Sequence, residues 1–243
     1  MRGMRLQARI PKRPERTVQL KHWKRPAQGI PRPVVLVREG MGEEAMSNRT
    51  ASVRRKTGET EIVLELNIDG SGIYDIETGI PFFNHMLDLL SKHSLIDLKL
   101  RAEGDLDVDY HHTVEDVGLA LGTALDEALC DRAGIRRYGS CVVPMDEALS
   151  RVAVDLGGRP YLVYSLDMKE RKIRDFDAWL LKHFFESFVQ KGRMNLHVEQ
   201  VYGDDVHHAY ESVFKAVARA LRQACERDSR VKGIPSSKGT LSE

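Results

Sequence analysis

The sequence predicts an α+β fold made of two similar halves, each with a mixed β-sheet and a pair of helices. From residue 60 onward, segments that alternate polar and apolar residues are interspersed with longer segments of helical periodicity. Residues 111–128 align with residues 207–224 at an offset of 96, and eight of the 18 aligned positions are identical. Average residue usage gives about one such match by chance. Each aligned segment also follows another histidine, His85 or His183, in an apolar helical segment.

The first half is predicted to begin with a strand, because apolar residues occupy every second position from Ile62 to Ile68. Asp69-Gly70-Ser71-Gly72 then favours a turn. Pro81 is suited to the first turn of the helix that follows, and the second helix is long and rich in Ala and Leu. The expected elements are strands at 61–68 and 96–102 and helices at 82–92 and 113–129.

The second half shows the same succession of patterns. Its expected elements are strands at 141–143, 150–156, 161–166 and 195–201 and helices at 177–191 and 205–227. Gly157-Gly158 separates the second of these strands from the third, which predicts a hairpin between them.

Composition divides the chain near residue 46. Residues 1–46 contain five of the nine prolines, show no sustained period and carry 11 Lys and Arg against 4 Asp and Glu. We interpret this segment as a disordered basic extension. The alternatives are a transit peptide, although such peptides are Ser-rich and this segment has no serine, or upstream translation before a natural start at Met46. Residues 47–243 are expected to form one catalytic domain with halves at about 54–138 and 139–243.

Charge and hydropathy argue against several classes of protein. Residues 47–243 carry a net charge of −6, which does not suit nucleic-acid binding. The longest apolar runs have four or five residues, so we expect neither a membrane span nor a secretory signal. Three cysteines are an odd number and fit a reducing compartment, so a cytoplasmic protein is expected.

The two aligned segments both begin with His-His-x-x-Glu, a pattern that points to metal binding. Residues four apart share a helix face, so His111 can converge with Glu115, and His207 with Glu211. Adjacent histidines project about 100° apart and cannot easily bind one ion together. We therefore expect two metal sites, each with three imidazoles and one carboxylate from different helices. The expected ligands are His85, His111, His112, Glu115, His183, His207, His208 and Glu211.

The donor types limit the metal without identifying it. Neither cluster contains cysteine, so a structural zinc site is not expected. Imidazole and carboxylate suit Mn²⁺, Fe²⁺, Co²⁺, Ni²⁺ or Zn²⁺. The alternative is that these are surface or core histidines paired with acids, but two clusters in register disfavour it. His93 and His197 have no repeat mate, and we interpret them as structural.

Basic residues at several places suggest an anionic substrate. Arg136-Arg137 follows the first long helix, Arg159 lies in a Gly-Gly-Arg-Pro turn, and Lys215 comes four residues after Glu211. Near the C-terminus, Pro235-Ser236-Ser237-Lys238-Gly239 combines hydroxyls with a lysine. Because a phosphate dianion needs several charge-assisted donors, together they indicate a phosphorylated substrate.

The chain from about Arg54 to Gly239 closely resembles the imidazoleglycerol-phosphate dehydratase family of histidine biosynthesis, in its monofunctional form. The residues that carry the resemblance are Arg55-Lys56-Thr57-Gly58-Glu59-Thr60, Phe83-Asn84-His85-Met86-Leu87, Gly104-Asp105-Leu106, His111-His112-Thr113-Val114-Glu115-Asp116, Arg137-Tyr138-Gly139, Met145-Asp146-Glu147, Asp155-Leu156-Gly157-Gly158-Arg159-Pro160, His207-His208-Ala209-Tyr210-Glu211-Ser212-Val213-Phe214-Lys215 and Pro235-Ser236-Ser237-Lys238-Gly239.

The resemblance implies a duplicated α+β fold of the ribosomal-protein-S5-domain-2-like kind and a hydro-lyase that converts D-erythro-imidazole glycerol phosphate to imidazole acetol phosphate. It implies two Mn²⁺ per active site, bound by the eight residues already named, and a homo-oligomeric shell of 24 subunits with active sites between subunits. The residues it implies for phosphate binding are Arg137, Arg159, Lys215, Ser237 and Lys238. Glu59 matches a substrate-binding carboxylate, and we choose it as the catalytic acid and base.

This reaction suits the residues. The C–H to be broken has no neighbouring carbonyl, so the imidazole ring of the substrate must accept the electrons, which two metal ions holding the ring would assist. The main alternative is a dinuclear metallohydrolase of phosphate esters, with the metals activating water. A metal store or metal-sensing shell is a non-enzymatic alternative, against which Arg137, Arg159 and Lys238 argue.

Overall fold

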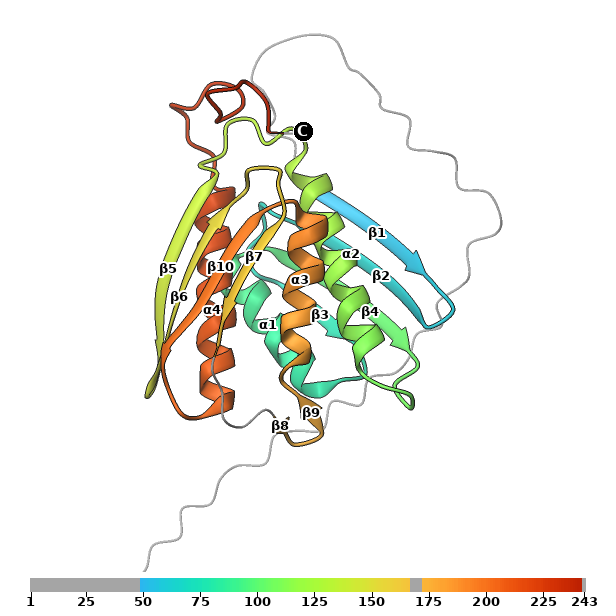
Figure 1. The fold of residues 1–243 in the computed structure, drawn as a ribbon. Helices are drawn as coiled ribbons and strands as arrows, with labels where there is room; N and C mark the ends of the chain where they lie inside the picture. Colours follow the sequence, from blue (N-terminus) through green and yellow to red (C-terminus); the bar gives the residue numbers. More distant parts are fainter. Residues whose placement is uncertain (1–48, 167–171, 242–243) are drawn as a thin grey trace, which may run out of the picture. The chain divides into compact units, whose positions relative to one another are not determined.

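A computed structural model describes residues 49–166 and 172–241, which form two four-stranded β-sheets with helices between them (Figure 1). The predicted basic extension, residues 1–46, lies outside the described residues. The fold class expected from the sequence is confirmed. No helix within the described ranges is both long and apolar enough to cross a membrane.

The first sheet has the strand order β1-β2-β4-β3. Its elements are β1 (Thr50–Lys56), β2 (Thr60–Asn67), β3 (Tyr74–Glu77), α1 (Pro81–Ser94), β4 (Asp97–Gly104) and α2 (His111–Leu129). Strand β2 is antiparallel to both of its neighbours, β1 and β4, whereas β3 runs parallel to β4. In β2, the apolar residues predicted to alternate, such as Ile62 and Leu64, are fully buried.

The second sheet repeats this arrangement with the order β5-β6-β10-β7. The elements of this half are β5 (Tyr138–Met145), β6 (Ala148–Asp155), β7 (Tyr161–Ser165), β8 (Lys172–Ile173), β9 (Phe176–Asp177), α3 (Leu180–Gly192), β10 (Asn195–Tyr202) and α4 (Val206–Cys225), of which β8 and β9 form a separate two-stranded sheet. Directions match strand for strand, with β7 parallel to β10 as β3 is to β4. The central strands β2 and β6 have the same burial pattern, so the halves repeat in packing as well as in order.

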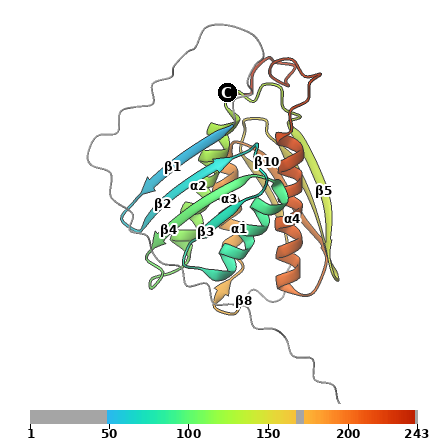
Figure 2. The ribbon, with the colours of Figure 1, turned by 180° about the vertical axis from the view of Figure 1, so that it is seen from behind.

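The helices of the two halves pack against each other between the sheets, α1 with α4 and α2 with α3 (Figure 1, Figure 2). Helix α2 approaches α3 closely because Gly118 and Gly122 face it. A Cβ atom at Gly118 would lie 2.7 Å from the carbonyl oxygen of Phe184, and one at Gly122 would lie 2.6 Å from that of Phe188. Each helix pair therefore joins one half of the chain to the other.

An aromatic cluster holds the helix layer together. The ring of Phe184 in α3 lies 5.4 Å from that of Phe83 in α1 and 5.8 Å from that of Phe214 in α4, measured between centroids. All three rings are fully buried. Burial of a Phe side chain stabilises the fold by about 1.5–3 kcal/mol, so these residues are a main part of the core.

Two features of the sheets differ from the sequence prediction. The hairpin expected at Gly157-Gly158 is wrong, because β10 lies between β6 and β7 in the sheet. Glycines indicate that the chain turns but not which strand it pairs with next. Strands β1 and β3, which are the edges of the first sheet, were not predicted from the sequence. Every second residue of β1 is exposed, and the others are only partly buried, so the strand lacks a strong apolar pattern.

Candidate metal centre and anion pocket

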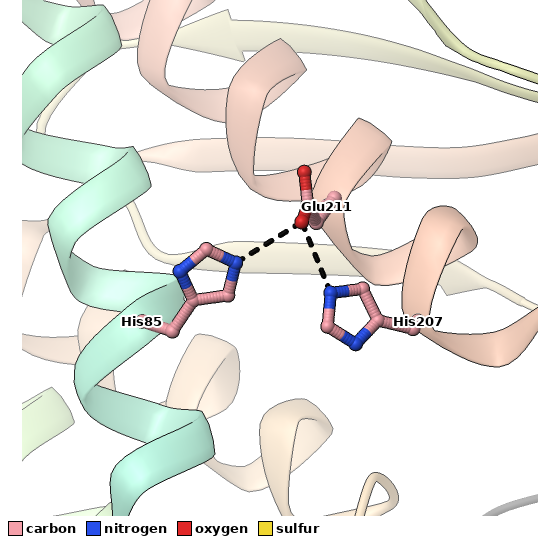
Figure 3. Close-up of side chains that lie close together, drawn as sticks. All are labelled: His85, His207 and Glu211. Carbon is pink, nitrogen blue, oxygen red and sulfur yellow. Dashed lines mark hydrogen bonds and ion pairs between the residues drawn. The ribbon is translucent and has the colours of Figure 1, made fainter. Parts of the chain in front are cut away.

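Three of the predicted ligands converge where α1 meets α4. His85 comes from α1, and His207 and Glu211 lie one turn apart on α4 (Figure 3). The Nε2 atoms of both histidines lie 3.0 Å from Oε1 of Glu211, and one donor atom from each residue lies within 4.8 Å of the others. The Glu211 side chain is 11% exposed and each imidazole 43%, so the carboxylate forms the floor and the rings form the rim.

The surroundings of Glu211 keep its carboxylate ionised. Burial by itself raises its pKa, but hydrogen bonds from Lys215, His85 and His207 outweigh this effect and lower the pKa to about 2. The Lys215 ammonium donates to the second oxygen, Oε2, at 2.5 Å. The site therefore presents a fixed negative charge beside two imidazoles, a donor set suited to a divalent cation.

A second group lies where α2 meets α3, and it is less convergent. Nε2 of His111 is 3.0 Å from Oε2 of Glu115, and the His111 ring centroid is 4.7 Å from that of His183. Nδ1 of His183, however, lies 3.2 Å from Glu186, its neighbour on α3. As in the first group, a His-x-x-x-Glu pair of one half meets the helix histidine of the other half.

The remaining two histidines of the predicted set lie apart from both groups. The ring of His112 is inclined by 87° to that of His111, and the ring of His208 by 88° to that of His207. In both pairs the ring centroids are 6.3 Å apart. Nδ1 of His112 is 3.1 Å from Asp105, and Nδ1 of His208 is 2.8 Å from Glu147. These hydrogen bonds to carboxylates raise the pKa of both imidazoles. A single chain thus arranges the eight predicted ligands as two groups of three and two single histidines.

Glu59, the predicted acid and base, stands beside His112. It lies in the turn between β1 and β2, where its Oε1 atom is 3.8 Å from Nε2 of His112 and its side chain is 56% exposed. The turn is held in place from two sides. The backbone N–H of Asp105 donates to the Glu59 carbonyl at 3.1 Å, and the Thr60 hydroxyl donates to the buried carboxylate of Asp116 at 2.5 Å.

Four of the five residues predicted to bind phosphate line one pocket of about 330 Å³, within the range of small-molecule sites. They are Arg137, Arg159, Ser237 and Lys238. Among the described residues, the side chains of Arg159 and Lys238 have no ion pair, so their charges are available to an anion.

Arg137 has a different role in the wall of this pocket. Its guanidinium donates to both oxygens of Asp155, at 2.7 and 3.0 Å, and to the Pro235 carbonyl at 2.9 Å. The last contact fixes the C-terminal segment that carries Ser237 and Lys238. Gly158 allows the same segment to approach, since a Cβ there would lie 1.6 Å from the Leu241 carbonyl oxygen.

Lys215, the fifth predicted phosphate ligand, is not among the residues that line this pocket. Its ammonium lies beside Glu211 and 3.2 Å from the sulfur of Met145. Three further acidic residues, Asp105, Glu147 and Asp116, contact the site but were not among the residues predicted from the sequence. Signals for all three were present, because each lies in a stretch that resembles the dehydratase family, but only the fold brings them to the histidines and to the Glu59 turn.

A sequence model of the family described as imidazoleglycerol-phosphate dehydratase matches residues 78–221. Proteins with that name from Citrifermentans bemidjiense and Thermobifida fusca are both 55% identical to this chain. The first match covers 193 residues, 79% of this chain and 99% of the relative. The second covers 196 residues, 80% of this chain and 100% of the relative.

The chain is also similar to solved structures with the same description. The crystal structure of the Staphylococcus aureus dehydratase has a TM-score of 0.67 and 36% identity, and covers 74% of this chain and 99% of that one. The Pyrococcus furiosus structure, in complex with (S)-C348, has a TM-score of 0.68 and 34% identity, with coverage of 77% and 99%.

Proposed function

The chain belongs to the imidazoleglycerol-phosphate dehydratase family, and we propose that its metal-ligand groups become complete manganese sites where subunits meet. The enzyme is a carbon–oxygen lyase of L-histidine biosynthesis that removes water from imidazole glycerol phosphate to give imidazole acetol phosphate. The relatives do not favour phosphate-ester hydrolysis, the alternative considered from the sequence.

The donor set fits two divalent ions per subunit. The eight predicted ligands supply only imidazole nitrogen and carboxylate oxygen, which suits Mn²⁺. In the α1–α4 group these atoms already lie close enough together to share one ion. When bound, the metal supplies Lewis acidity that stabilises negative charge on a nitrogen heterocycle.

The geometry of one subunit supports active sites shared between subunits. Each group of three provides two imidazoles and one carboxylate, one imidazole short of the expected set. His112 and His208 stand apart, about one-third exposed, with Nε2 atoms that form no hydrogen bond among the described residues. We assign each of them to a group on a neighbouring copy. This arrangement requires a homo-oligomer, and the family resemblance favours a shell of 24 subunits.

Glu59 is placed to act on the substrate held by these ligands. Because it lies beside His112, a copy that contributes His112 also contributes Glu59. We assign its carboxylate to accept the proton of the C–H bond and to help protonate the hydroxyl on the adjacent carbon, which leaves as water. The resulting enol becomes the ketone by proton transfer. Arg159, Ser237 and Lys238 hold the phosphate, so that the reacting C–H meets Glu59 in one orientation.

The observation that carries this proposal is the convergence of His85, His207 and Glu211 from two different helices. Incubation of the full chain with Mn²⁺ and imidazole glycerol phosphate tests the reaction. We expect ketone formation without release of inorganic phosphate, whereas phosphate release would support the hydrolase. We propose a cytoplasmic location, which the free thiols of Cys130, Cys141 and Cys225 support.

Size-exclusion chromatography of chelated protein tests the placement of the metals. An ion that bridges chains stabilises only the assembled state, so chelation is expected to shift the oligomer to smaller species, and Mn²⁺ to restore it. An intact oligomer with the metal demonstrably removed would contradict metal sites between subunits.

A further inference from the structure

Two carboxylates outside the predicted ligand set contact the same atom of two equivalent histidines. Both oxygens of Asp105 lie 3.1 Å from Nδ1 of His112. Oε2 of Glu147 lies 2.8 Å from Nδ1 of His208. These are the second histidines of the two His-His-x-x-Glu motifs, the ones that no other proposed ligand of their own subunit contacts.

The chain duplication does not account for this pair of contacts. Asp105 follows β4 in the first half, whereas Glu147 lies in the turn between β5 and β6 in the second. The equivalent of that turn in the first half is the β1–β2 turn, and there the residue just before the central strand is Glu59. The two halves therefore supply a carboxylate to the same histidine atom from different places in the fold, which indicates a requirement of the site rather than an inherited feature.

We propose that Asp105 and Glu147 are positioning residues of the metal centre, each accepting a hydrogen bond from the Nδ1–H of its histidine, so that the hydrogen stays on Nδ1 and Nε2 is left as the ligand atom. This proposal rests on the proposed manganese function. A neutral imidazole carries one N–H, and only its other nitrogen can bind a metal. A carboxylate that accepts the N–H fixes both the tautomer and the direction of the ring.

The surroundings of both histidines make such support necessary. Their side chains are 32% and 30% exposed, so packing alone does not fix the rings. Each of the two acidic residues is itself held by a hydrogen bond, Asp105 through its backbone and Glu147 through its carboxylate. The Asp105 N–H donates to the Glu59 carbonyl, and Oε1 of Glu147 accepts from the N–H of Asp205 at 3.2 Å. Asp205 in turn caps α4 by accepting from the N–H groups of His207 and His208.

The difference between the halves also means that Asp105 affects Glu59. In the second half, the carboxylate of the turn residue Glu147 is hydrogen-bonded to Nδ1 of His208. In the first half, Asp105 takes that position, and the equivalent turn carboxylate, Glu59, stays 3.8 Å from Nε2 of His112, beyond hydrogen-bond distance. Asp105 thereby leaves Glu59 free for proton transfer.

Equilibrium dialysis of the full chain against Mn²⁺ tests the proposal. We expect the wild type to bind two ions per subunit. Asp105→Ala is expected to weaken one ion by about 10–100-fold and leave the other unchanged, and Glu147→Ala to do the same. The double variant should weaken both. Asp105→Asn and Glu147→Gln should restore part of the affinity, because an amide oxygen can accept the same N–H.

Exposed acids nearby provide matched controls. Asp107→Ala and Asp204→Asn each remove one negative charge from an exposed residue four or five positions before one of these histidines in the sequence, but neither side chain hydrogen-bonds to a histidine in the described part of the chain. Both should bind Mn²⁺ like the wild type. Equal losses in the controls would overturn the proposal in favour of a general effect of charge.

The second readout is the tautomer in metal-free protein, from nitrogen NMR of ¹⁵N-labelled histidine. His112 and His208 are expected to be protonated at Nδ1 in the wild type and to lose this preference in Asp105→Ala and Glu147→Ala respectively. Unchanged tautomers, or unchanged Mn²⁺ affinity in both alanine variants, would overturn the proposal. A wild type that binds no Mn²⁺ would instead contradict the proposed metal function, and the metal-free tautomers would still decide the positioning role.

Discussion

Substitution of Gly118 in α2 by alanine should separate α2 from α3 and damage one metal group while sparing the other. In a helix interior, alanine is ordinarily more stable than glycine by about 1 kcal/mol. Here the added Cβ would lie 2.7 Å from the Phe184 carbonyl oxygen and 2.9 Å from Cβ of Ser187. Ordinary contact needs about 3.5–4.0 Å, so the helices must move apart by roughly 1 Å. Overpacking of this kind typically costs about 1–3 kcal/mol, which exceeds the gain in propensity.

The net loss of up to about 2 kcal/mol corresponds to a decrease in melting temperature of up to roughly 8 °C for a domain of this size. The same movement separates His111 and Glu115 on α2 from His183 on α3. Functional geometry generally tolerates only about 0.5 Å, so kcat should fall by up to ~10²-fold. Mn²⁺ titration should show the larger loss of affinity for one of the two ions, because the three ligands that one chain supplies to the α1–α4 group include no residue from α2 or α3.

Differential scanning calorimetry and metal titration measure both effects. Glu127→Ala, on the exposed side of the same helix, is the control and should change neither. An increase in melting temperature in Gly118→Ala would show that helix propensity dominates and would refute the close-packing argument. Two ions of unchanged affinity would refute the assignment of a metal group to the α2–α3 contact.

Three further substitutions and a change of pH test the proposed site, and one truncation tests the N-terminal extension. Glu59→Gln should retain assembly and metal but lower kcat by roughly 10²–10⁴-fold, because it removes the proton acceptor; wild-type kcat would assign the base elsewhere. Arg159→Ala should raise KM and lower kcat/KM by about tenfold or more, since it removes a charge-assisted bond to phosphate, and an unchanged kcat/KM would remove Arg159 from the site. His207→Ala should abolish turnover and shift the oligomer to smaller species on size exclusion, with no recovery on adding Mn²⁺. Acid should have the same effect reversibly, because protons compete with the metal for the imidazole nitrogens, and hydrogen bonds to carboxylates raise the pKa of His112 and His208 so that they take up protons more readily as the pH falls; an oligomer that keeps its metal at pH 5 would contradict this. A chain starting at Met46 should assemble and turn over like the full chain, and loss of assembly would show that residues 1–46 are needed.

Periodicity predicted the parts of the site that lie within one helix. The spacing of His207 and Glu211 requires them to share a face, and the spacing of His111 and His112 requires them to diverge, as the structure shows. Sequence patterns also located the central strands, because β2 and β6 each bury one complete face.

Contacts between distant segments were beyond the reach of these patterns. Nothing in the sequence near His85 indicates that it meets His207 rather than His111, since that depends on α1 packing against α4. Likewise, Lys215 lies four positions after Glu211, a spacing that allows Lys215 either to bind phosphate or to form an ion pair with Glu211. Only the fold shows that its ammonium lies against the Glu211 carboxylate. Edge strands such as β1 bury no full face, so their composition carries little signal.

The pairing of α1 with α4 and of α2 with α3 has a consequence for the ancestry of the fold. In a chain with only one half, the helix histidine and the His-x-x-x-Glu pair would belong to two different groups of metal ligands. Two such chains, related by a twofold axis, would bring each histidine to the other's pair and create two identical centres. Fusion of the two genes would make the two centres covalently linked and free to diverge, as the different supports of His112 and His208 now illustrate. A single half expressed alone would thus be a metal protein only as a dimer.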